Sequence, residues 1–91
     1  PVTPLKVVGD IDAYLHREDV GKLIFSGLLE NCRGPSIVLS PEGSTREAAV
    51  KLYHAIQELD ALGLSLIVAE RAPERGLGHA INDRLQKASI K

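Results

Sequence analysis

Gly76 and Gly78 stand where an apolar run of residues gives way to a helical pattern. The first backbone N–H groups of a helix have no partner within the helix, and glycine lets a phosphate or another chain segment come close to them. Arg71, Arg75 and Arg84 could add positive charge around a phosphate held there. The spacing therefore predicts either anion binding at this turn or a structural turn at which helix and sheet pack closely.

Neither glycine-containing loop completes a known nucleotide-binding motif. The dinucleotide-binding fingerprint requires a third glycine where this chain has Ile81. The loop from Ser40 to Ser44 lacks the Gly-Lys-Ser/Thr sequence of a phosphate-binding P-loop, and turn formation accounts for its composition. Anion binding at the Gly76 turn therefore stays open as one of two interpretations.

The histidine, cysteine and acidic residues form no pattern typical of a catalytic or metal site. His16, His54 and His79 fall in three different predicted helices, and a pair such as His54 and Glu58, one helical turn apart, is usually a solvent-exposed pair and not a metal site. Cys32 has no base nearby in the sequence, so a loop thiol is the simpler interpretation. We predict no catalytic residue and no metal site in this chain.

The composition is that of a small domain without a strong charge. Its 91 residues can form one hydrophobic core but not two domains. Lysine and arginine total 11 against 12 aspartate and glutamate, so no general attraction to nucleic acid or to an anionic membrane is expected. The single cysteine rules out an internal disulfide, and no apolar run approaches the roughly 18 residues that cross a bilayer. We predict a cytoplasmic location.

Hydrophobic patterning predicts strands that alternate with helices. The strands are expected at residues 5–8, 22–25, 36–40 and 64–69, and the helices at about residues 10–16, 44–62 and 78–88. Ser44 and Glu47 match a capping box, in which each side chain accepts a bond from the other residue's backbone N–H. This alternation predicts an α/β fold: a small Rossmann-like three-layer sandwich with a mostly parallel sheet of about four strands and helices on both faces.

The second half of the chain carries an ordered set of motifs. These are Ser40-Pro41-Glu42-Gly43-Ser44, Arg46-Glu47-Ala48-Ala49, Leu52-Tyr53, Leu59-Asp60, Ala69-Glu70, Glu74-Arg75-Gly76-Leu77-Gly78 and Ala80-Ile81-Asn82-Asp83-Arg84-Leu85. In the order and spacing of these motifs, residues 40–85 resemble the carboxy-terminal domain of long-form threonylcarbamoyl-AMP synthases. The combination is far more specific than either glycine alone, and residues 1–35 fit that domain more loosely.

The resemblance implies a parent enzyme with an amino-terminal YrdC-like catalytic domain, a proline-containing linker and a small Rossmann-like domain behind it. Residues 1–4 are then the end of the interdomain linker, and residues 5–91 are a single accessory domain. The implied parent joins threonine, bicarbonate and ATP, with magnesium, into threonylcarbamoyl-AMP and pyrophosphate. A partner transferase then modifies tRNA, which this domain would meet only indirectly. The ATP site belongs to the catalytic domain, so the chain alone is expected to be catalytically silent.

Three functions from different classes therefore remain open. The first is an accessory domain that docks on the catalytic domain and its linker or gates the active site. The second is a stand-alone nucleotide- or phosphate-binding module, and the third is an oligomerisation domain. No membrane partner is expected. The candidate residues for docking or anion binding are Arg71, Arg75, Gly76, Gly78, His79, Asn82 and Arg84.

Overall fold

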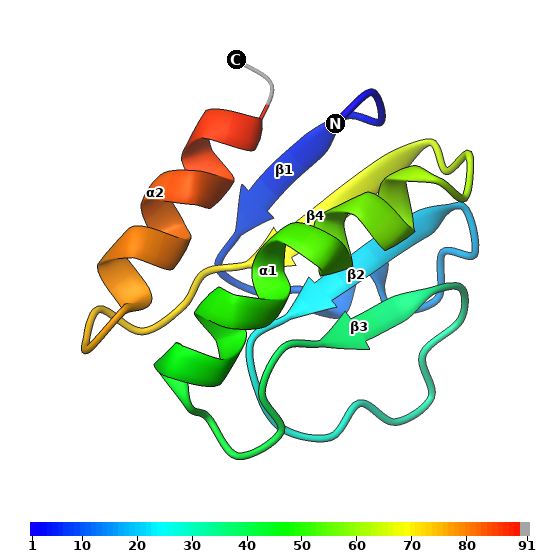
Figure 1. The fold of residues 1–91 in the computed structure, drawn as a ribbon. Helices are drawn as coiled ribbons and strands as arrows, with labels where there is room; N and C mark the ends of the chain where they lie inside the picture. Colours follow the sequence, from blue (N-terminus) through cyan, green and yellow to red (C-terminus); the bar gives the residue numbers. More distant parts are fainter. Residues whose placement is uncertain (90–91) are drawn as a thin grey trace.

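A four-stranded, entirely parallel sheet forms the centre of the protein (Figure 1). A computed structural model describes residues 1–89. The strand order is β1-β4-β2-β3, so β4 lies between β1 and β2. The elements in chain order are β1 (Leu5–Val8), the 3₁₀ helix η1 (Asp12–Tyr14), β2 (Val20–Ile24), β3 (Ser36–Val38), α1 (Thr45–Asp60), β4 (Leu66–Glu70) and α2 (Gly78–Ala88). The α/β fold with a parallel sheet is confirmed.

The direction of each connection explains which face it covers. The chain moves from β1 to β2 and on to β3 in one direction, and from β3 back to β4 in the other. Because crossovers between parallel strands are right-handed, opposite directions place the connections on opposite faces. The connecting helix α1 accordingly lies on one face, while η1 and residues 26–35 pack on the other. Helix α2 follows the last strand and packs on the same face as α1 (Figure 1). The predicted helix at residues 10–16 is thus a single 3₁₀ turn.

Successive residues of the strands contribute their side chains alternately to two separate apolar clusters, one on each face of the sheet. Leu23 and Ile67 point to the cluster beneath α1 and α2, whereas Ile24 and Val68 point to the cluster beneath η1. All four side chains are buried, as the period of two along a strand requires when both faces are covered. The two-sided burial of β4 confirms the prediction that residues 64–69 contain a strand covered on both faces.

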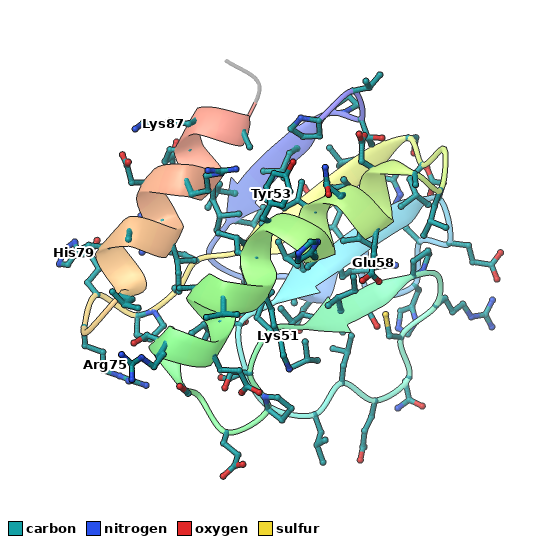
Figure 2. All side chains as sticks on the ribbon, viewed as in Figure 1. Lys51, Tyr53, Glu58, Arg75, His79 and Lys87 are labelled. Carbon is teal, nitrogen blue, oxygen red and sulfur yellow. The ribbon has the colours of Figure 1, made fainter. Side chains whose placement is uncertain are left out.

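Helix α1 begins as the sequence predicts, but only half of the capping box forms. The Ser44 side chain accepts a hydrogen bond from the backbone N–H of Glu47 at 3.1 Å. The backbone N–H of Ser44 instead donates to the hydroxyl of buried Ser40 at 2.8 Å. Further along α1, Tyr53 lies on the side toward α2 and Glu58 on the opposite side (Figure 2).

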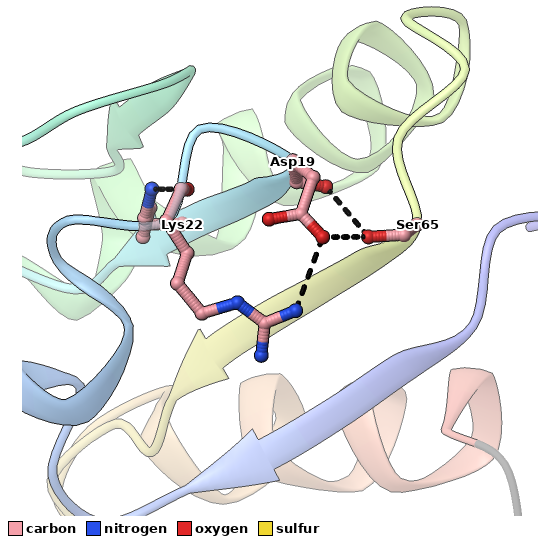
Figure 3. Close-up of polar contacts among 4 residues, drawn as sticks. Asp19, Lys22 and Ser65 are labelled. Carbon is pink, nitrogen blue, oxygen red and sulfur yellow. Dashed lines mark hydrogen bonds and ion pairs between the residues drawn. The ribbon is translucent and has the colours of Figure 1, made fainter.

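A buried lysine stabilises the segments that cover the sheet face opposite α1 and α2. Lys22 is in the middle of β2 and is fully buried, although the sequence suggested an apolar strand there. Its ammonium group donates to the backbone oxygen of Arg17 at 2.6 Å and to that of Arg33. Nearby, the Asp19 carboxylate accepts bonds from Arg17 and from Ser65 at the start of β4 (Figure 3). Lys22 therefore ties β2 to both loops that cover this face.

Replacing Lys22 with methionine is expected to lower the free energy of unfolding by about 1–2 kcal/mol, because one partly buried carbonyl loses its strong donor. The oxygen of Arg17 keeps a second backbone donor, whereas that of Arg33 keeps only the thiol of Cys32 at 3.7 Å. Urea denaturation measures the change. Lys87→Met, at an exposed position, is the control and should stay within about 0.5 kcal/mol. Equal losses for the two variants would contradict this role.

Candidate functional site

Two loops meet at the carboxyl edge of the sheet and build the candidate site. One follows β3 (residues 40–44) and the other follows β4 (residues 71–77). The backbone N–H of Leu77 donates to the hydroxyl of Thr45 at 3.1 Å, and the Arg75 guanidinium donates to the backbone oxygen of Gly43 at 3.0 Å. In parallel α/β folds this edge is where ligands usually bind. The glycine turn predicted from the sequence therefore lies at the expected edge and is fixed to the start of α1.

The two glycines of the turn are required by close contacts within the chain. Gly76 has a φ of 52°, and a Cβ atom there would lie 2.5 Å from the Thr45 hydroxyl oxygen. A Cβ atom on Gly78 would lie 1.7 Å from the backbone oxygen of Pro73, a distance that no structure tolerates. The Gly78 N–H already donates to the backbone oxygen of Arg75 at 2.8 Å. The space that a side chain would need at each glycine is filled by the chain itself, so close packing accounts for both glycines.

Asn82 joins helix α2 to the loop that follows β4. Its side chain is buried, donates to the backbone oxygen of Ala72 and accepts from the backbone N–H of Ala72, both at 2.8 Å. Ala72 is also buried and belongs to the segment that leaves β4. An amide side chain can satisfy a donor and an acceptor of one residue at once, which explains asparagine here. The predicted docking candidate Asn82 therefore has an internal partner.

The charged candidates do not form one cluster: Arg75 lies in the turn, whereas Arg84 lies further along α2. Arg71, Arg75 and His79 are exposed, and His79 points away from the domain (Figure 2). Arg84 lies further along α2, where its guanidinium carbon is 5.5 Å from the centre of the Tyr53 ring. Such a stacked arrangement is a cation–π contact. The structure thus separates Arg84 from the turn and pairs it with a residue of α1 that the sequence did not single out.

A groove runs between α1 and α2, and we call it the interhelix groove. It consists of a hollow of about 240 Å³ and a second of about 170 Å³, and both are lined by Tyr53 and Arg84. The larger hollow is completed by Pro1, Ile56, Gln57, Asp60 and Ala88, and the smaller by Ala49, Leu52, Ala80 and Ile81. The sequence could not reveal this pairing, since the lining residues come from two helices and the amino-terminal segment.

Asp60 fixes the first residues of the chain at one end of this groove. Its carboxylate accepts the backbone N–H of Thr3 at 2.7 Å and that of Val2 at 3.3 Å. These bonds, chiefly the one from Thr3, hold the pKa of the Asp60 carboxyl below its ordinary value of 3.8. The sequence marked Asp60 as part of a Leu-Asp motif and as a candidate acid, and its role as a partner of the first backbone N–H groups was missed.

The bond from Thr3 should be visible in a pH titration. Because the folded-state pKa of Asp60 lies below the unfolded-state value, the bond contributes stability above pH 3.8 that is lost as the pH falls through the folded-state pKa. In NMR spectra, the Thr3 amide proton should therefore titrate with a midpoint below pH 3.8. Asp60→Asn should abolish this step. A midpoint at or above 3.8, or a step that survives in Asp60→Asn, would contradict the assignment.

Other chemistry finds no support in the described part of the chain. Within residues 1–89, no group of three or more His, Cys, Asp or Glu side chains is arranged to hold a metal ion. Cys32 is half-buried, and its thiol donates a hydrogen bond to the backbone oxygen of Arg33. No helix in the same range combines the length and apolar character that a membrane-crossing segment needs.

The fold and the packed turn define the class: a small α/β domain with a Rossmann-like parallel sheet. A family model described as the C-terminal domain of threonylcarbamoyl-AMP synthase matches residues 8–89, and the chain belongs to this family. The threonylcarbamoyl-AMP synthase of Pyrococcus abyssi (strain GE5 / Orsay) is 41% identical over 46 residues. That match covers 50% of this chain but only 14% of the relative. The resemblance inferred from residues 40–85 is confirmed and extends over nearly the whole chain.

Proposed function

We propose that this chain is a non-catalytic accessory domain of an L-threonylcarbamoyladenylate synthase that serves tRNA modification in the cytoplasm. In this proposal a separate YrdC-like domain binds ATP and magnesium and joins threonine, bicarbonate and ATP into threonylcarbamoyl-AMP and pyrophosphate. The family match over residues 8–89 supports the assignment to this enzyme. The observation that favours an accessory role is that close contacts within the chain account for both glycines of the turn.

The motif residues support this role because their hydrogen bonds hold the loops at the carboxyl edge of the sheet in one rigid arrangement. Hydrogen bonds from Leu77 to Thr45 and from Arg75 to Gly43 join the loop after β4 to the start of α1 and the loop before it. Asn82 joins α2 to the exit of β4. A rigid surface of this kind suits docking of a second domain better than repeated binding and release of a nucleotide. A docked domain that holds a linker over the adenylate would exclude water from a mixed anhydride that otherwise hydrolyses.

Pyrophosphate release tests the proposal. The longer polypeptide that carries this domain should release pyrophosphate only when threonine, bicarbonate and ATP are all present, and the 91-residue chain should release none. The catalytic portion of the longer polypeptide, cut before Pro1, should still catalyse the reaction. It should form threonylcarbamoyl-AMP more slowly or lose more of it to hydrolysis. Pyrophosphate release by the 91-residue chain would overturn the proposal, as would a longer polypeptide that is inactive with all three substrates.

Calorimetry separates this proposal from a nucleotide-binding module. Titration of the 91-residue chain with ATP and with AMP should give no saturable heat, since the N–H groups of Leu77 and Gly78 already have acceptors. The exposed guanidinium of Arg75 supplies a positive charge beside the turn. Saturable binding that is lost in Arg75→Ala, with Lys87→Ala as a control, would favour the nucleotide-binding function instead.

A further inference from the structure

We propose that the interhelix groove seats the segment that the longer polypeptide places directly before Pro1, and that Tyr53 and Arg84 hold this segment in an extended conformation. This inference rests on the proposed function, because the segment exists only in a longer synthase. The matched part covers 14% of the length of the P. abyssi relative, so most of such an enzyme lies outside this chain. The connecting segment must reach the domain at one defined place.

The position of the first residues defines that place. Pro1 lines the larger hollow of the groove together with Tyr53 and Arg84. The next two residues are held by the Asp60 carboxylate, and Thr3 is buried. With Val2 and Thr3 fixed in this way, a residue that precedes Pro1 starts inside the hollow. The second hollow continues to Ala80 in the first turn of α2, so the groove provides a path toward the glycine turn.

The chemistry of the groove suits an extended peptide. Proline restricts the residue before it to the β or polyproline II region, so the arriving chain is extended at Pro1. An extended segment of this kind leaves its backbone carbonyl groups free, and aromatic grooves are a common way to bind it. The Arg84 guanidinium can donate up to five hydrogen bonds and forms no ion pair among the described residues. It is therefore available to backbone carbonyl groups or to a carboxylate.

The exposure of Tyr53 also indicates that the groove is incomplete in this chain. The residue is 51% exposed although it lies on the side of α1 that faces α2, and its hydroxyl accepts a bond from Gln57 at 2.9 Å. The apolar floor beside it includes Ile56 and Leu52. A peptide laid over the ring would bury apolar surface from both sides and would enclose the Arg84 guanidinium, which strengthens its hydrogen bonds.

Hydrogen exchange of the longer polypeptide tests this inference. We expect the amides immediately before Pro1 to be protected in the parent protein and to exchange at least about tenfold faster in Arg84→Ala and in Tyr53→Ala, since a charge-assisted bond or a stacked ring is lost. Lys87→Ala, on the same helix, is the matched control and should leave the rates unchanged. Amides within β4 should exchange equally in all four proteins, which shows that each variant is folded.

The outcomes separate this inference from the proposed function. Unprotected amides before Pro1, or equal exchange rates of these amides in Arg84→Ala and Lys87→Ala, would overturn the proposed binding in the groove even if pyrophosphate release is normal. A dimer that dissociates in Tyr53→Ala would assign the groove to a second copy of the chain and overturn the inference as well. If no longer polypeptide exists, both the proposed function and this inference fail.

Discussion

Replacing Gly78 with alanine is expected to lower the free energy of unfolding by about 3 kcal/mol or more, which is the upper end of the range for overpacking. The added Cβ atom would lie 1.7 Å from the backbone oxygen of Pro73, and a backbone atom cannot move aside as a flexible side chain can. Elsewhere in a helix the same change stabilises by up to about 1 kcal/mol through helix propensity. Urea denaturation followed by circular dichroism measures the loss.

The matched control for Gly78 is Gly9. A Cβ atom on Gly9 meets no heavy atom within 4 Å, so Gly9→Ala should change the free energy of unfolding by no more than about 0.5 kcal/mol. If Gly78→Ala were as stable as Gly9→Ala, the turn would have free space above its glycines. The nucleotide-binding alternative would then regain its main structural argument.

Replacing Asn82 with alanine is expected to cost about 2–4 kcal/mol, because a buried donor and a buried acceptor both lose their partner. The two groups are the backbone N–H and oxygen of Ala72, each now 2.8 Å from the Asn82 side chain. Asn82→Asp keeps the acceptor for the N–H but presents a carboxylate to the Ala72 oxygen. It should therefore also be destabilised at neutral pH, where the carboxylate cannot donate.

The control for Asn82 is Gln86, an exposed residue on the same helix. Gln86→Ala removes a side-chain amide without leaving a buried backbone group unpaired, and should change the free energy of unfolding by no more than about 0.5 kcal/mol. Equal effects of Asn82→Ala and Gln86→Ala would show that the contact with Ala72 adds nothing. The family motif would then have to be explained by an external partner.

The fold was largely predictable because strong local patterns specify it. The apolar spacing of α1 correctly predicts the side of the helix that packs on the sheet. The continuous apolar run of β4 correctly predicts that this strand contributes to the apolar clusters on both faces of the sheet. The 3₁₀ turn was the weak point, because so short a segment satisfies its backbone through single i to i+3 bonds, such as that from Tyr14 to Ile11. Lys22 was also missed, since its partners are backbone carbonyls that composition does not reveal.

The site was predictable in position but not in its contacts. The glycine turn was correctly placed between β4 and α2, because glycine after an apolar strand has few other uses. That the turn packs on Thr45 could not be foreseen, since the two loops are far apart in sequence. The same limit applies to the Tyr53–Arg84 pair and to the bond between Asp60 and Thr3. Long-range pairing is decided by how the layers assemble.

The size of the native protein tests the central claim most directly. An antibody raised against this chain should be used on extracts of the source cells, without prior enrichment. The accessory-domain account predicts one band much larger than 9.8 kDa, and that polypeptide, once purified, should release pyrophosphate with threonine, bicarbonate and ATP. A band at 9.8 kDa without a larger one would contradict the account, because no catalytic domain would accompany this chain.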